Sequence, residues 1–311
     1  MGTWVMPASD IVQITPVPRN WRCYPGIYYK NIDEECIDRI IKNDKIDRIQ
    51  ISEKLPDEAF EAIDMILSRK PELAFRIYSI YEEFDISFLE RMPHLKNLTL
   101  ECHLRSCPDA IDFNVLTRLK LKTLSLQAFD LRDYSFMQSL STELEDLTIA
   151  ADTTGAAIQF DCKWLLRYEH LKSLWLSNKA RKNISCLAEH PHIKSLSLRG
   201  IKLTDFGFLK QMQLEKLALL WNSNNQLAEL GELTSLKEIE LWRIGKLDNI
   251  DFISKLVNLE VIRLQDLKHI KELPDLSKLH NLKRLILDNT GIDFSKIDDD
   301  LMKIVECYNF E

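Results

Sequence analysis

The hexapeptide LKSLWL at residues 171–176 is followed by IKSLSL at 193–198, LEKLAL at 214–219 and LKEIEL at 236–241. Each stretch places apolar residues in the order L-x-x-L-x-L, so that the last two lie two positions apart. In an extended chain these two side chains point to one face, and the residue between them points to the other. Each stretch therefore predicts a β-strand with one apolar face.

The same triad occurs eleven times along the chain, and most successive copies begin 20 to 23 residues apart. The other copies begin at residues 46, 75, 95, 121, 144, 259 and 282. One such strand cannot bury its apolar face alone, whereas strands stacked side by side in parallel form a continuous core. The sequence therefore predicts an α/β solenoid with about eleven parallel strands.

A second phrase recurs between the strands, for example LTDFGFL from residue 203 and LPDLSKL from 273. Its apolar spacing predicts a short helical turn on the other side of each coil. The aspartates of the phrase occupy the position where a side-chain oxygen caps such a turn, which favours a structural role over catalysis. They are Asp85, Asp133, Asp205, Asp251 and Asp275.

These residues resemble the leucine-rich-repeat family, in particular its bacterial internalin-like class, over residues 46–294. The resemblance implies a horseshoe with parallel strands on the concave face and short helical or 3₁₀ turns on the convex face. It also implies a concave surface that binds proteins or other macromolecules without carrying out chemistry. The Asn that usually follows the strand is present here only as Asn222, with Asp152 as a substitute. We therefore expect irregular curvature or a different packing at that corner.

The two ends of a solenoid would expose its apolar core to water, and helical caps are therefore expected at both ends. Residues 33–43 have helical apolar spacing, residues 56–68 predict a second helix, and residues 298–308 predict a closing helix. The run Asp298, Asp299, Asp300 resembles a metal cluster, but a helix N-terminus is the favoured place for it. We expect one continuous domain, with an N-terminal extended segment and helical cap at 1–45, repeats at 46–294 and a C-terminal cap at 295–311.

The composition is that of a folded, soluble protein: 311 residues, 45% apolar, with 41 basic and 48 acidic side chains and a net charge of −7. This acidic balance argues against nucleic acid or an anionic membrane as partner. The chain shows no evident signal peptide, surface anchor or spanning segment, and its seven scattered cysteines favour reduced thiols. We therefore predict a cytoplasmic protein without cofactor, taken as a monomer by default.

Strand parity predicts which side chains face outward, and in the later repeats these change from small and polar to large and charged. Tryptophan and arginine are enriched in binding hot spots, and charges of both signs around them suit a protein partner. The alternative is that the tryptophans only pack against each other or their neighbours. The predicted partner-binding residues are Trp175, Arg199, Lys216, Leu220, Trp221, Glu238, Glu240, Trp242, Arg263 and Gln265.

The sequence leaves three functions open. The favoured one is a non-enzymatic scaffold that binds a protein on the concave face. The second is an immunity- or antitoxin-type inhibitor that neutralises a toxin or nuclease. The third is an enzyme or zinc site at Cys102, His103 and Cys107, for which only a weak signal exists because a fourth ligand is missing.

Overall fold

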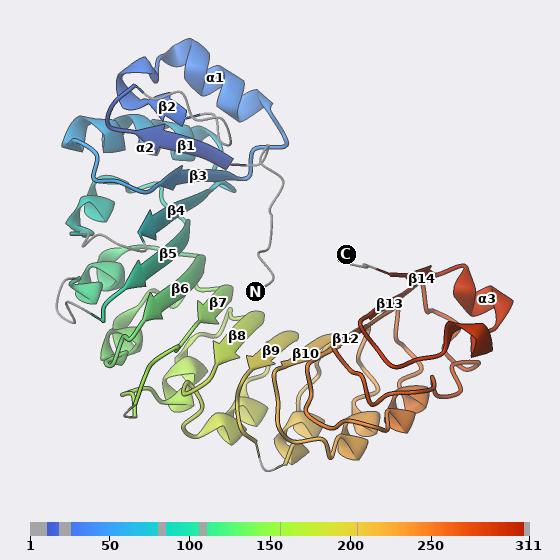
Figure 1. Cartoon of the computed structure of the whole chain (residues 1–311). Coiled ribbons are helices and arrows are strands. Elements are labelled where there is room, and N and C mark those ends of the chain that lie inside the picture. Colours follow the sequence, from blue (N-terminus) through green and yellow to red (C-terminus); the bar gives the residue numbers. More distant parts are fainter. Residues whose placement is uncertain are drawn as a thin grey trace. The chain divides into compact units, whose positions relative to one another are not determined.

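The computed structural model in Figure 1 describes residues 11–18, 26–79, 85–105, 111–155, 157–203 and 205–307. The chain forms two compact units, Met1–Gln159 and Phe160–Glu311. Each unit holds one layer of parallel strands and one layer of helices or short helical turns.

The first unit has strands in the order β2-β1-β3-β4-β5-β6-β7, all paired in parallel. The strands are β1 (Ile11–Thr15), β2 (Gly26–Tyr28), β3 (Arg48–Ile51), β4 (Ala74–Ser79), β5 (Asn97–His103), β6 (Thr123–Phe129) and β7 (Asp146–Ile149). Its helices are α1 (Glu34–Lys42) and α2 (Asp57–Arg69). The 3₁₀ turns are η1 (Tyr29–Asn31), η2 (Ser87–Arg91), η3 (Phe113–Arg118) and η4 (Ser135–Ser139).

The second unit continues the pattern with strands in chain order from β8 to β14, again parallel. They are β8 (Ser173–Ser177), β9 (Ser195–Arg199), β10 (Lys216–Leu220), β11 (Glu238–Trp242), β12 (Val261–Gln265), β13 (Arg284–Asp288) and β14 (Val305–Glu306). Its turns are η5 (Cys162–Arg167), η6 (Ile184–Glu189), η7 (Gly207–Gln211), η8 (Ala228–Glu232), η9 (Asp251–Lys255) and η10 (Phe294–Lys296), and its helix is α3 (Asp299–Met302).

A strand is present at each of the eleven predicted places, as β3 to β13. The register predicted for the triad at residue 75 is wrong. The buried residues of β4 that pair with Leu98 and Leu100 are Phe75 and Ile77, so this repeat begins three residues earlier.

The apolar positions of the triad are buried, as Leu196 and Leu198 of β9 illustrate with no measurable exposure. The strands β1, β2 and β14 were not predicted. They flank the repeats, and their short sequences IVQIT, GIY and VE lack the leading leucine of the triad.

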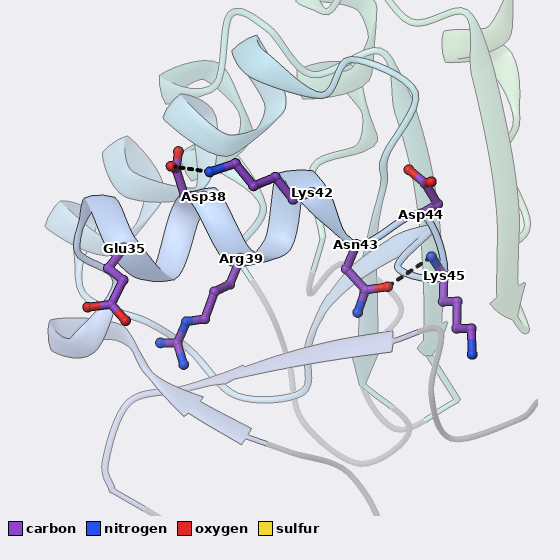
Figure 2. A pocket seen from close by; sticks show the side chains of 7 residues that line it. All are labelled: Glu35, Asp38, Arg39, Lys42, Asn43, Asp44 and Lys45. Atoms are coloured by element: carbon purple, nitrogen blue, oxygen red, sulfur yellow. Dashed lines mark hydrogen bonds and ion pairs between the residues drawn. The ribbon is translucent and has the colours of Figure 1, made fainter.

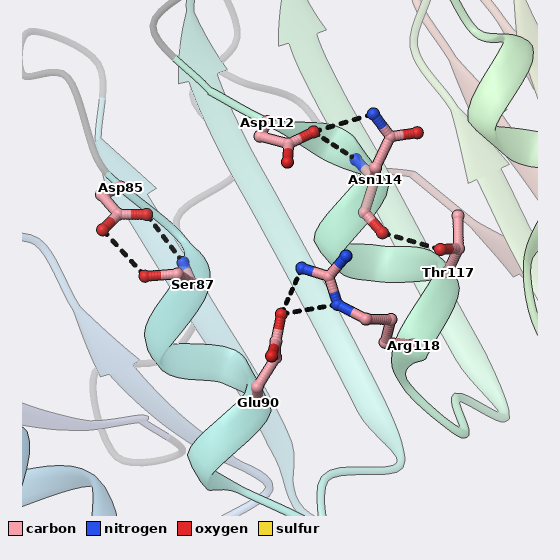
Figure 3. Close-up of polar contacts among 7 residues, drawn as sticks. All are labelled: Asp85, Ser87, Glu90, Asp112, Asn114, Thr117 and Arg118. Atoms are coloured by element: carbon pink, nitrogen blue, oxygen red, sulfur yellow. Dashed lines mark hydrogen bonds and ion pairs between the residues drawn. The ribbon is translucent and has the colours of Figure 1, made fainter.

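The recurring aspartates make the predicted bond at four of the five positions, and at three of these a 3₁₀ turn follows. After Asp275 no helical turn forms before β13, so that predicted turn is wrong. Asp85 accepts a hydrogen bond from the Ser87 backbone N–H at 2.9 Å, as Figure 3 shows. The same bond, from the residue two positions on, is made at Asp133, Asp205 and Asp275. Asp112, Asp161 and Asp293 cap turns in the same way, although they lie outside the recurring phrase.

Asp251 is the exception, and its predicted capping role is wrong. The Asp251 backbone N–H donates to the side-chain oxygen of Asn249 at 2.9 Å, so Asn249 supplies the cap and Asp251 is the first residue of η9. The sequence NID contains two side chains that can cap a turn, Asn249 and Asp251, and Asn249 is the one that does so.

The two helices that the spacing predicts in the first unit are present as α1 and α2. Asp33 caps α1 by accepting from the Cys36 N–H at 2.8 Å, and Pro56 directly precedes α2. The outer face of α1 is charged, and Figure 2 shows an ion pair of 2.8 Å between Lys42 and Asp38 on it. Lys70, only 7% exposed, donates from Nζ to the carbonyls of Asn43 and Ile46 and so ties the end of α2 to the end of α1.

The C-terminal cap differs from the prediction of one helix over 298–308. The helix α3 spans only Asp299–Met302, and the chain then returns to the sheet as β14. Asp298 caps α3 by accepting from the N–H groups of Asp300 and Leu301, which confirms the capping role for this acidic run. The helix is short because Ile304 donates its N–H to Leu301 O, and Leu285 of β13 donates to Ile304 O, which directs the chain into the sheet.

Candidate binding surface

The register of the second unit sorts its outward side chains into three rows that cross the strands. The first row is Ser173, Ser195, Lys216, Glu238, Val261 and Arg284. The middle row is Trp175, Ser197, Ala218, Glu240, Arg263 and Ile286. The last row, at the carboxyl ends of the strands, is Ser177, Arg199, Leu220, Trp242, Gln265 and Asp288.

The residue that follows each of the strands β8 to β13 has a left-handed backbone conformation. These corner residues are Asn178, Gly200, Trp221, Arg243, Asp266 and Asn289, with φ between 49° and 65°. Each of the first five donates its backbone N–H to the carbonyl of the last residue in the next strand, at 2.7 to 3.0 Å. The corner is thus closed by the backbone instead of by an asparagine ladder, which is the different packing expected there.

Two of these corners carry residues that disfavour this conformation. Glycine, asparagine and aspartate adopt the left-handed region most readily, and they occupy the other four corners. Trp221 and Arg243, at φ 54° and 53°, sit there at a cost of about 1–2 kcal/mol each. Side chains held in such strained positions gather at functional sites.

Trp221 is the centre of a cluster of aromatic and cationic side chains, which we call the Trp221 cluster (Arg199, Trp221, Trp242 and Arg243). The guanidinium carbon of Arg199 lies 4.4 Å from the centroid of the Trp221 ring, and that of Arg243 lies 4.8 Å from it. The Trp242 ring meets Trp221 edge-on, with centroids 5.7 Å apart. Despite these contacts Trp221 remains 41% exposed, which makes it one of the exposed large apolar residues of the described chain.

Asp266 fixes one side of the cluster. Its carboxylate accepts from Trp242 Nε1 at 2.9 Å, from Arg243 Nη2 at 3.1 Å and from Asn289 Nδ2 at 2.5 Å. Partial burial pushes the pKa of Asp266 upward, but these three donors outweigh it and hold the pKa below its usual value. The neighbouring Asp288 has a raised pKa because of burial and of the Asp266 charge. The charged Asp266 therefore orients both Trp242 and Arg243.

In the second unit, each copy of the triad thus builds one strand followed by a left-handed corner, and the next copy pairs beside it in parallel. The fold is a leucine-rich-repeat solenoid. No protein-family model matches the chain, and no curated protein matches its sequence significantly.

Among solved structures, an internalin of Listeria monocytogenes, InlF, is similar over 79% of this chain and 67% of its own, with 21% identity and a TM-score of 0.48. Internalin C2 of the same species is similar over 60% of this chain and 80% of its own, with 26% identity and a TM-score of 0.48. The leucine-rich-repeat domain of APL1B is similar over 86% and 73%, with 15% identity and a TM-score of 0.36. The parallel sheet of this chain is consistent with an internalin-like leucine-rich-repeat protein.

The structure brings three of the predicted partner-binding residues, Arg199, Trp221 and Trp242, into one cluster. Leu220 belongs to the same row but is only 8% exposed, because it lies between Arg199 and Trp242 on the neighbouring strands. Its side chain is therefore not presented to solvent, and Leu220 is wrong as a predicted partner-binding residue. Gln265, next to Trp242 in the last row, is half-buried.

The remaining predicted residues lie in the first and middle rows. Lys216 and Glu238 form an exposed ion pair at 2.8 Å. Glu240 stands opposite Arg263 on the next strand, and burial raises the pKa of Glu240 while the arginine opposes that shift. Trp175 is half-buried opposite Ser197, two residues along the strand from the row of Arg199. These residues flank the Trp221 cluster within the leucine-rich-repeat sheet.

Three residues of the site were not predicted from the sequence: Arg243, Asp266 and Asn289. All three are corner residues, which strand parity does not cover. The available signal was that Asn, Asp or Gly follows four of the six strands β8 to β13, so that Trp221 and Arg243 depart from the pattern.

The other candidate sites carry no comparable arrangement. No group of metal-ligating side chains occurs among the described residues, and burial raises the pKa of the Cys102 thiol to about 12, which disfavours a thiolate ligand. Cys107 of the weak zinc hypothesis lies outside the described residues. The depression beside α1, shown in Figure 2, is lined by charged or amide side chains only. None of the described helices is long and apolar enough to cross a membrane.

Proposed function

We propose that the chain is a non-enzymatic protein-interaction scaffold, and that its second unit binds a protein partner through the Trp221 cluster. The observation that carries the proposal is the pair of corners at Trp221 and Arg243. Both hold side chains that the local backbone disfavours, in positions where the other four repeats of the second unit use Asn, Asp or Gly. A cost of about 1–2 kcal/mol at each corner calls for a compensating gain outside the corner itself.

Contacts within the protein supply part of that gain. Stacking of a guanidinium on an exposed tryptophan is worth about 0.5–1 kcal/mol, and an edge-on aromatic pair about 0.5–1.5 kcal/mol. These contacts also hold the exposed indole in one orientation, so that little side-chain entropy is lost when a partner covers it. Large aromatic and arginine side chains on a rigid support are the residue types that dominate binding energy at interfaces.

The surroundings suit a protein partner. The first and middle rows next to the Trp221 cluster combine both charge signs, through Lys216 with Glu238 and Glu240 with Arg263. A surface with an aromatic centre and mixed charges at its rim resembles protein interfaces. The inhibitor function stays a prediction, and one-to-one binding with a strong salt dependence would favour it.

The test is capture of partners from native lysate by the immobilised full chain, by Trp221→Gly and by Trp164→Ala, followed by mass spectrometry. Gly suits the left-handed corner, so Trp221→Gly removes the indole without straining the backbone. Trp164, half-buried in η5 of the same unit, is the matched control. We expect a protein that the wild type and Trp164→Ala retain and that Trp221→Gly loses at least about tenfold, a difference near 1.4 kcal/mol. Equal retention by Trp221→Gly would refute the proposal.

A further inference from the structure

We infer that the partner contacts this surface through an acidic segment, which lies along a basic rim next to the Trp221 cluster. The inference rests on the proposed function and specifies the chemistry of the partner. We define the basic rim as Lys202, Lys246 and Lys268, which project from the loops that follow β9, β11 and β12. These loops begin at the corner residues Gly200, Arg243 and Asp266.

The three lysines of the basic rim are exposed and occupy related places in their repeats. Lys202 and Lys268 each lie two positions after a corner residue, and Lys246 lies three positions after Arg243. Within the described part of the chain, none of the three forms an ion pair with a carboxylate. Lys216, Lys237 and Lys283 are paired, whereas Lys163, Lys255 and Lys278 in or near the turns form no ion pair among the described residues either. The rim is therefore distinguished by the grouping of its three lysines next to the Trp221 cluster. The rim therefore presents uncompensated positive charge.

The charge of the loops contrasts with the charge of the whole chain. The corner segments 199–203, 221–226, 242–248 and 265–271 carry six basic side chains and two carboxylates, a formal charge of +4, in a chain whose net charge is −7. One of the two carboxylates, Asp266, is engaged by Trp242, Arg243 and Asn289. A local charge of sign opposite to that of the rest of the chain points to a partner with complementary, negative charge.

The same features favour an acidic protein segment over a single-stranded nucleic acid. Nucleic-acid binding of this kind needs a free aromatic face on which a base can stack. The guanidinium groups of Arg199 and Arg243 already lie over the Trp221 ring, at 4.4 and 4.8 Å from its centroid. In addition, Glu238 and Glu240 on the adjoining rows would repel a continuous phosphate chain. A peptide with carboxylates only at intervals can pair with the lysines of the basic rim and place its uncharged residues near Glu238 and Glu240.

The spacing of the rim sets the spacing of those carboxylates. Paired strands lie about 4.8 Å apart, so the loops after β9 and β11, two strands apart, are separated by about 10 Å. An extended peptide rises about 3.3 Å per residue, so it covers this distance in about three residues. The loops after β11 and β12 are one strand apart, about 5 Å, which an extended peptide covers in one to two residues. We therefore expect two acidic residues about three positions apart, followed by a third one or two positions further on.

The test is fluorescence anisotropy of a labelled peptide whose glutamates are separated by a Gly-Ser pair and then by a single Gly, in the order Glu-Gly-Ser-Glu-Gly-Glu, added to the full chain. The comparison probes are the same peptide with lysine in place of glutamate, and a labelled oligothymidine. The rim variant is Lys202→Glu with Lys246→Glu and Lys268→Glu. The matched control is Lys163→Glu with Lys255→Glu and Lys278→Glu, which changes the charge equally on exposed positions in or near the turns of the same unit.

We expect the wild type to bind the glutamate peptide more tightly than either comparison probe. The rim variant should weaken this binding by about tenfold, and the control variant by less than about twofold. Absence of binding to the glutamate peptide, equal weakening by both variants, or tighter binding of oligothymidine would each overturn the inference. If Trp221→Gly loses a captured partner while the rim variant keeps it, the proposed function stands and the acidic segment is refuted.

Discussion

Replacing Asp266 by asparagine removes the charge that holds one side of the Trp221 cluster, while keeping the shape of the side chain. Asparagine also tolerates the left-handed backbone at φ 53°, so the change isolates the carboxylate from the corner. The side chain of Asp266 is only 19% exposed and accepts three hydrogen bonds. An asparagine offers one acceptor oxygen and turns its own amide donors toward the other donors.

The expected loss follows from these bonds. A hydrogen bond to a charged group contributes about 1.5–3 kcal/mol, and the asparagine retains part of the set, so we expect Asp266→Asn to lower the free energy of unfolding by about 2–3 kcal/mol. For a unit of this size that corresponds to a fall in Tm of roughly 5–10 °C. Because repeats contact only their neighbours, the loss should be local to the strands around β11 to β13.

Urea unfolding followed by tryptophan fluorescence measures this difference, with Asp248→Asn as the matched control. Asp248 is exposed and lies in the loop of the preceding repeat, so its replacement should change stability by less than about 0.5 kcal/mol. The pKa of Asp266 is lowered in the folded chain, so its contribution is present above the unfolded pKa near 3.9 and is lost as the pH falls through the folded value. Equal stability of the two variants at neutral pH would refute the role given to Asp266. So would a difference in unfolding free energy between the wild type and Asp266→Asn that does not shrink on acidification.

Four further changes test other parts of the structure. Trp221→Gly should be more stable than Trp221→Ala by about 1 kcal/mol in urea unfolding, because alanine strains the left-handed corner; the reverse order contradicts that backbone conformation. Lys70→Met should destabilise the chain by about 2–4 kcal/mol, since it leaves two carbonyls without their donor, and an unchanged unfolding curve argues against those bonds. Asn249→Ala should lower the free energy of unfolding more than Asp251→Ala does, by about 1 kcal/mol, because it removes the cap of η9. Equal effects of the two changes would contradict the reassigned cap. Cys102 should react with a thiol reagent only after unfolding, because burial raises the pKa of its thiol to about 12; rapid labelling of the native chain contradicts this.

The triads were sufficient to predict that a strand lies at every repeat, although the triad at residue 75 was set three residues out of register. Side-chain parity is a property of the extended backbone, and therefore LKEIEL also predicted that Glu238 and Glu240 share the outward face of β11. The strands β1 and β14 were not predicted because they lack the apolar triad, although β1 buries Ile11, Val12 and Ile14. The choice of Asn249 over Asp251 as a cap depends on where the turn begins, which a single phrase leaves open.

The candidate site was predicted in part. Strand parity and register made it possible to place Arg199 and Trp242 on one face, with Trp221 at its edge. Strand parity could not assign Arg243 and Asp266 to this site, because the direction of a side chain after the strand depends on the left-handed corner. Strand parity also did not predict the burial of Leu220, since that burial depends on the side chains of both neighbouring strands.

Hydrogen exchange of the full chain, with and without a captured partner, tests the binding surface most directly. The corner amides of Gly200, Trp221 and Arg243 donate to the next strand, and a bound partner should slow their exchange further. We predict that the slowing is concentrated in the loops that follow β9, β10 and β11 and is absent from the turns η6 to η9. Protection centred on those turns, or on the sheet of the first unit, would contradict a binding surface built around Trp221.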